Sequence, residues 1–80
     1  MIVFKKFWAE WCSPCKMLNP VVDELKSQYP NVQFVSVNVD TESQETVKYG
    51  IRSIPAVIIE KDGQLVQNIT GAQPKSVYEN

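Results

Sequence analysis

Trp11-Cys12-Ser13-Pro14-Cys15 is the segment that decides the fold of this chain, and it holds the only two cysteines. A strand-like run precedes the segment and a helical pattern follows it. A disulfide that closes so short a loop removes little entropy from the unfolded chain, compared with one that spans a long loop. The pair is therefore better suited to reversible chemistry than to stabilising the fold.

The composition is that of one small globular domain covering residues 1–80, with 44% hydrophobic and 21% charged residues. A net charge of −1 gives no indication of a nucleic-acid partner. No apolar run is long enough to span a bilayer, and the first residues lack the pattern of a secretory signal. We therefore expect a cytoplasmic protein without a membrane partner, with a mature exported form as the alternative. In a reducing compartment, two cysteines at this spacing are more often catalytic or metal-binding than structural.

Histidine is absent, which narrows the possible chemistry. A Cys–His nucleophilic pair and a histidine metal ligand are both excluded. A zinc site with four cysteines would need a second chain, because one chain supplies only two thiolates. Half of a structural metal site, or an iron–sulfur site between chains, remains an alternative to a redox dithiol.

The pattern of apolar and turn residues predicts an α/β fold. It predicts strands at 2–8, 32–39, 56–60 and 65–70, helices at 14–29 and 42–49, and a short helical piece from residue 74. Pro20 lies inside the first helix, Asp40 or Thr41 can cap the second, and Gly50 suits its end. The order β-α-β-α-β-β-α makes the first two strands parallel and the last two a hairpin at Asp62-Gly63. We expect a mixed four-stranded sheet with helices on both faces.

Cys12 and Cys15 lie three residues apart at the start of the first predicted helix. Residues at this spacing have Cβ atoms about 5–6 Å apart, which is close to disulfide range. Pro14 suits the first helical turn, where its missing N–H costs nothing. Cys12 then faces unpaired backbone N–H groups and the positive end of the helix dipole, and both favour its thiolate. We predict that Cys12 is the nucleophile, and that the deeper Cys15 resolves the mixed disulfide.

The segment Phe7-Trp8-Ala9-Glu10-Trp11-Cys12-Ser13-Pro14-Cys15-Lys16-Met17 resembles the active-site segment of thioredoxins. Three further stretches agree in order: Pro20, Lys48-Tyr49-Gly50-Ile51-Arg52-Ser53-Ile54-Pro55, and Lys61-Asp62-Gly63 followed by Gly71-Ala72. The resemblance covers nearly the whole chain. It implies a thioredoxin-like fold and dithiol–disulfide exchange with protein disulfide substrates. It also implies an electron donor similar to thioredoxin reductase, and neither a bound cofactor nor a metal.

The resemblance also assigns residues around the cysteines. Ile54-Pro55 would be a cis bond facing the cysteines, which would bare the Ile54 backbone for pairing with a substrate peptide. A trans proline at the start of a strand is the alternative. The apolar substrate-docking rim corresponds to Trp11, Pro14, Ile54, Gly71 and Ala72, beside Pro55. Trp8 matches the inner tryptophan beside the active site, although its position also suits a plain core residue. Ser13 replaces the usual glycine.

The chain departs from the thioredoxin pattern on its first strand. Thioredoxins usually carry an extra strand and helix before it, so we expect one sheet face to lack a covering helix near Lys5, where the family prefers an apolar residue. Lys6 stands where the family buries a carboxylate, and Ser36 replaces the usual lysine partner. A buried ammonium needs a partner, so Lys6 should reach solvent or a carbonyl group. It cannot accept the proton of Cys15, but a nearby cation would favour the Cys15 thiolate.

Three classes of function remain open at this stage. The leading one is a small disulfide reductase that acts as a monomer. A glutathione-coupled protein similar to glutaredoxins fits the chain length, although glutaredoxins favour Pro-Tyr between the cysteines. Both of these are enzymes. The second class is a thioredoxin-fold binding subunit with dispensable cysteines, and the third is a metal or iron–sulfur site between chains.

Overall fold

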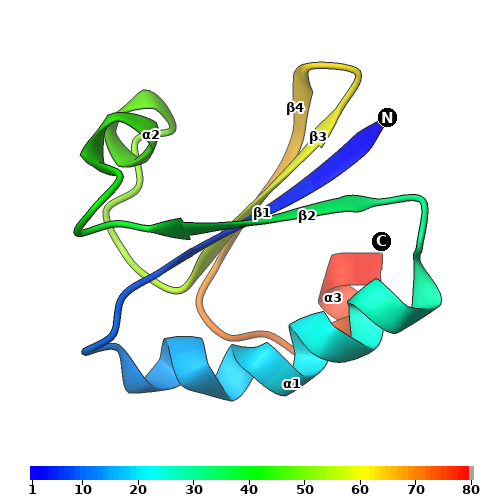
Figure 1. Ribbon diagram of the computed structural model, residues 1–80, viewed down its shortest axis with the longest axis horizontal. Helices are drawn as coiled ribbons and strands as arrows, with labels where there is room; N and C mark the ends of the chain where they lie inside the picture. Colours follow the sequence, from blue (N-terminus) through cyan, green and yellow to red (C-terminus); the bar gives the residue numbers. More distant parts are fainter. Residues whose placement is uncertain (80) are drawn as a thin grey trace.

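The structure is a computed structural model that describes the backbone of residues 1–79 (Figure 1). It contains the seven elements in the predicted order. They are β1 (Ile2–Trp8), α1 (Ser13–Gln28), β2 (Gln33–Asn38), α2 (Ser43–Lys48), β3 (Ala56–Lys61), β4 (Gln64–Thr70) and α3 (Lys75–Glu79). The bounds differ from the predicted ones by at most one residue, which is within the usual uncertainty at element ends.

The four strands form one mixed sheet in the order β2-β1-β3-β4. β1 and β2 are parallel because α1 crosses between them, whereas β3 is antiparallel to both β1 and β4. Figure 1 shows α1 and α3 on one side of the sheet and α2 on the other. The predicted sheet, with helices on both faces, is confirmed.

The larger part of the core lies between the sheet and α1. The apolar residues of α1 recur at helical spacing and pack against inward-facing strand residues and the α3 residue Tyr78. The buried cluster comprises Phe4, Leu18, Val22, Leu25, Val57, Ile69 and Tyr78. This packing fixes α1 along the sheet and thereby fixes the position of its first turn, which contains the cysteines.

The opposite face of the sheet is packed around Phe7, which is fully buried. Val37, Ala56 and Ile58 complete this cluster, and Tyr49, which follows α2, packs against it. Gly50 has a φ of 63°, as expected for a glycine that ends a helix. α2 therefore covers this face through the residues at its end.

The predicted cap of α2 was wrong. The residue before α2 is Glu42, and it makes no side-chain hydrogen bond to the helix. Both predicted caps have other partners: the Asp40 carboxylate accepts from the Trp11 indole, and the Thr41 hydroxyl donates to the Asn38 carbonyl. Both candidate capping side chains therefore form hydrogen bonds with groups outside α2.

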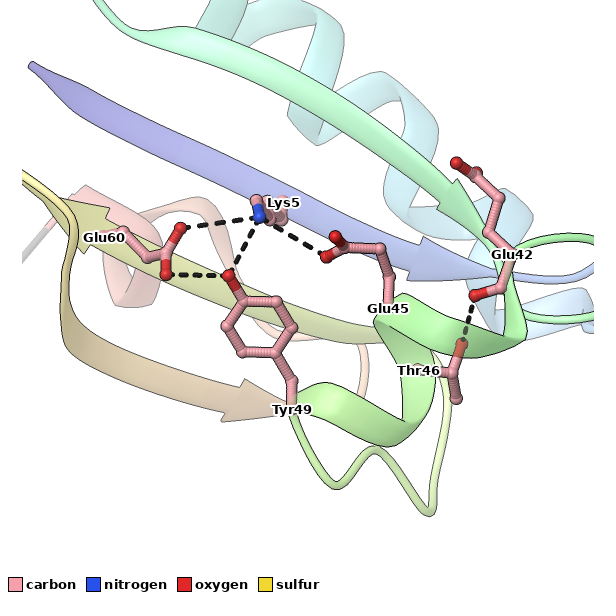
Figure 2. Close-up of polar contacts among 6 residues, drawn as sticks. All are labelled: Lys5, Glu42, Glu45, Thr46, Tyr49 and Glu60. Carbon is pink, nitrogen blue, oxygen red and sulfur yellow. Dashed lines mark hydrogen bonds and ion pairs between the residues drawn. The ribbon is translucent and has the colours of Figure 1, made fainter.

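Lys5 lies on the α2 face and is largely covered there (Figure 2). Its Nζ donates to the Tyr49 hydroxyl at 2.9 Å and lies 3.5 Å from a Glu45 carboxylate oxygen. The Tyr49 hydroxyl in turn donates to Glu60 at 2.8 Å, and Lys5 Nζ lies 3.6 Å from the same carboxylate. Lys5 therefore stays charged beneath this cover because three polar groups meet its ammonium.

Candidate active site

The two cysteines form a disulfide at the first turn of α1. Cys12 is the N-cap residue, Pro14 lies in the first turn, and the Cα atoms of the cysteines are 5.3 Å apart. The Cys12 sulfur accepts a hydrogen bond from the Cys15 backbone N–H at 3.3 Å. Sulfur thus takes the place that a serine or aspartate oxygen holds in an ordinary helix cap. The predicted location of Cys12 at the helix N-terminus is confirmed.

Both cysteines are nearly inaccessible in this oxidised state. Cys12 is 5% exposed and Cys15 is 2% exposed, so Cys15 is the deeper residue but only slightly. The difference in exposure is too small to separate their chemistry. What separates them is the helix terminus, because within the described part of the chain a helix N–H donates to the Cys12 sulfur and none donates to that of Cys15.

A ring of apolar residues surrounds the disulfide. Ala9 is fully buried against it, and Trp8 and Ile54 are half-buried and pack on the same cluster. Trp8, the last residue of β1, therefore lies beside the disulfide, and its buried indole Nε1 has no hydrogen-bond partner among the described residues. The Ile54–Pro55 peptide bond is cis, as the resemblance implied.

The proposed docking residues after β4 lie next to this ring. The Gly71 N–H donates to the Pro55 carbonyl at 2.7 Å, so the turn after β4 is fixed beside the segment before β3. Gly71 is half-buried and Ala72 is exposed. The structure thus brings residue 71 next to residues 54 and 55, although it lies far from them in the sequence.

The outer side of the disulfide is bordered by exposed residues. Trp11 is 69% exposed, and its indole Nε1 donates to an Asp40 carboxylate oxygen at 2.9 Å. Ser13 and Pro14 are also exposed. Asp40 is a site residue that sequence reasoning considered only as a helix cap. No local pattern indicates its contact with Trp11, because 29 positions separate the two residues.

The inner side of the disulfide contains an unusual charge. Lys6 is only 9% exposed, and its Nζ donates to the Asn19 side-chain oxygen at 2.5 Å. This oxygen is the carbonyl group that Lys6 was expected to reach. Burial lowers the pKa of Lys6 below its usual 10.5, Lys26 lowers it further, and Asp23 opposes both. Sequence reasoning missed Asn19, and its one signal there is the position four residues after Cys15 on the same helix.

An open cavity of about 580 Å³ lies beside this inner side, lined by Trp8, Glu10, Cys15, Lys16 and Asn19. It connects the deeper cysteine to the surface near the Lys6–Asn19 contact. Among the described residues, no group of three or more histidine, cysteine, aspartate or glutamate side chains could hold a metal ion. No helix in this described part is long and apolar enough to cross a membrane.

Comparisons with known proteins agree on one family. The thioredoxin family model matches residues 1–80. Thioredoxin 1 of Synechococcus elongatus is 49% identical over 79 residues, which cover 98% of this chain and 74% of that protein. Oxidised mitochondrial thioredoxin 3 of Saccharomyces cerevisiae superposes with a TM-score of 0.92 at 35% identity, over 98% of this chain and 74% of that one. Fasciola hepatica thioredoxin superposes with a TM-score of 0.91 at 32% identity, over 98% of this chain and 75% of that one.

Proposed function

This chain belongs to the thioredoxin family and is a protein thiol–disulfide oxidoreductase, and from that premise we propose how its two cysteines divide the reaction. The Cys12 thiolate attacks one sulfur of a substrate disulfide and releases the other sulfur as a thiolate. The Cys15 thiolate then attacks the Cys12 sulfur and releases the second substrate sulfur. Two electrons pass to the substrate, and the dithiol becomes the disulfide seen here.

The observation that carries this assignment is the hydrogen bond from the Cys15 N–H to the Cys12 sulfur. In the reduced protein the same N–H and the positive end of α1 would face a thiolate, whose negative charge both stabilise. Cys15 lies inside the first turn, where its own sulfur receives no such bond in this structure. Attack on an outside disulfide is therefore favoured at Cys12.

The exposed border of the site supports docking of a protein substrate. Trp11 presents a large exposed aromatic surface beside Cys12, and its bond to Asp40 holds the indole in place. Ile54 packs against the disulfide, and Gly71, followed by the exposed Ala72, is bonded to Pro55 and offers backbone and small apolar groups there. An extended peptide could lie along this border and pair with the backbone near Pro55. The site is supported by Trp8, which packs against the cysteines, and by the first turn of α1, which contains Ser13 and Pro14.

The remaining parts of the proposal concern the cellular setting. Thioredoxins act with thioredoxin reductase, and we assign this chain a donor of the same kind, so that it needs no cofactor of its own. Residues 1–80 act as a single domain and as a monomer. A reducing cytoplasm would keep the dithiol in its active form.

Reduction of insulin disulfides, driven by NADPH and a bacterial thioredoxin reductase, tests the proposal. The wild-type protein should turn over, and Cys12→Ser should abolish turnover. Cys15→Ser should instead trap a covalent complex with the substrate through Cys12. Turnover only with glutathione and glutathione reductase would contradict the assigned donor and favour the glutaredoxin-like alternative.

A second measurement tests the order of the thiols directly. In Cys15→Ser, the rate of iodoacetamide alkylation of Cys12 should rise at a pH well below the value of about 8.5 that is typical of a free thiol. Cys12→Ser is the matched control, because Cys15 is then the only thiol and should react slowly at neutral pH. Alkylation of Cys12 with the profile of free cysteine would refute its role as the attacking group.

A further inference from the structure

Lys6 is the only charged side chain that is buried among the described residues. It lies on the α1 face of β1, and among the described residues its ammonium has one hydrogen bond, to Asn19 of α1. None of the ion pairs in the described part of the chain includes Lys6. Burying an ammonium without a carboxylate partner is costly, so its presence beside the redox pair calls for a physical explanation.

We propose that Lys6, positioned by Asn19, stabilises the thiolate form of Cys15 and so promotes the second step of exchange. This inference rests on the proposed function, because it assigns to Cys15 the role of resolving thiol. The positive charge of Lys6 would act on the Cys15 sulfur electrostatically, without contact to the substrate. Asn19 keeps the ammonium against α1 rather than free in solvent.

The geometry places the charge behind the deeper cysteine. Cys15 and Asn19 lie four residues apart on α1, so their Cβ atoms are about 6 Å apart. Both residues line the same open cavity, and Lys6 Nζ contacts the Asn19 oxygen. The i,i+4 spacing and this contact together put the ammonium within roughly 10 Å of the Cys15 sulfur. At the effective dielectric constant of a protein, a unit charge at this range shifts a pKa by about one unit.

The other charges near this position leave the ammonium uncompensated. On α1, Asp23 and Lys26 act on Lys6 in opposite directions. Across the sheet, its register partners are Ser36 on β2 and Val57 on β3, and neither carries a charge. At the cavity, Glu10 and Lys16 again have opposite signs. Lys6 is therefore the charge that distinguishes the surroundings of Cys15 from those of an exposed thiol.

The consequence concerns the second step, in which Cys15 must lose its proton before it attacks the Cys12 sulfur. A cation behind Cys15 makes the thiolate available without a dedicated base, and the proton can leave through the cavity to water. Lowering the pKa by one unit gives about ten times more thiolate below that pKa. Because a less basic thiolate is also a weaker nucleophile, the rate gains only about threefold.

Thiol titration in the Cys12→Ser background tests this inference, because Cys15 is then the only cysteine. Serine is itself a good helix cap, so the first turn should be retained. The ultraviolet absorbance of the thiolate gives the titration midpoint. Adding Lys6→Met should raise that midpoint by about one pH unit, and Asn19→Ala should raise it by a smaller amount.

Lys5→Met is the matched control, because it removes the same charge from the neighbouring residue on the opposite face of β1. It should leave the Cys15 midpoint unchanged. An unchanged midpoint in Lys6→Met, or an equal rise in both lysine variants, would overturn the inference. The outcome is independent of the proposed function, since it depends on Cys15 alone.

Kinetics separate a role in the second step from a general loss of structure. With both cysteines present, Lys6→Met should slow release of the mixed disulfide about threefold at neutral pH. The difference should reverse at alkaline pH, where Cys15 is ionised in both proteins and the more basic thiolate of the variant is the better nucleophile. The first step, measured as alkylation of Cys12, should keep its rate. Slowing that is independent of pH would indicate a structural role only and would contradict the proposal.

Discussion

Removing the hydroxyl group of Tyr49 by Tyr49→Phe should lower the stability of the domain by about 2 kcal/mol. The hydroxyl accepts from Lys5 at 2.9 Å and donates to Glu60 at 2.8 Å (Figure 2). Hydrogen bonds to charged groups contribute about 1.5–3 kcal/mol each in favourable cases. We expect less than the sum of two such bonds, because Lys5 still has Glu60 at 3.6 Å and the aromatic ring at 4.8 Å after the hydroxyl is removed.

Thermal unfolding of the oxidised protein, followed by circular dichroism, measures this effect. In a domain of this size, 1 kcal/mol corresponds to a change in Tm of about 4–8 °C, so Tyr49→Phe should lower Tm by about 10 °C. A double-mutant cycle with Lys5→Met supplies the control. Tyr49→Phe should cost about 1 kcal/mol less once the lysine is absent, because the hydroxyl then has one charged partner. The reasoning is refuted if Tm is unchanged, or if the two substitutions are additive.

Three further predictions concern stability and are measured by urea unfolding. The Tyr49 hydrogen bond raises the pKa of Lys5 above 10.5, so the stabilisation that Lys5→Met removes should be constant at neutral pH and vanish only as pH rises through that raised value. Burial lowers the pKa of Lys6, so Lys6→Met should stabilise the fold by about 1 kcal/mol at neutral pH, an advantage that shrinks as alkali neutralises the wild-type ammonium. Gly63→Ala should cost about 1 kcal/mol through its φ of 83° alone, since no atom beyond the neighbouring residues in the chain lies within 4 Å of the added methyl group. An unchanged midpoint of unfolding for any one variant would contradict the corresponding prediction.

The sequence predicted the arrangement of elements well, because local rules govern most of it. Alternating and helical spacing of apolar residues marked each strand and helix, and turn residues marked their ends. At the hairpin, Asp62 and Gly63 both have positive φ, of 53° and 83°, as an Asp-Gly turn requires. The position of Cys12 followed in the same way from Pro14 and the start of the helix.

Contacts between distant residues were harder to predict. The Asp40 side chain could cap a helix or meet Trp11, and only the packed structure decides between them. The same holds for Lys6, whose partner Asn19 comes from a helix that packs across the strand. The polar partners of Lys5 were not predicted either, because they depend on where Tyr49 comes to lie. Each of these outcomes depends on tertiary packing, which local patterns do not encode.

The register of β1 has a practical use for anyone who needs to label this protein. Ile2 pairs with Lys61, so the Asp62-Gly63 turn lies next to the first residue of β1, whereas the cysteines follow its last residue. Seven strand residues at about 3.3 Å each put roughly 23 Å between the turn and the disulfide. A fluorophore or affinity tag attached at this turn should therefore label the protein without changing the rate of disulfide exchange at the other end of β1.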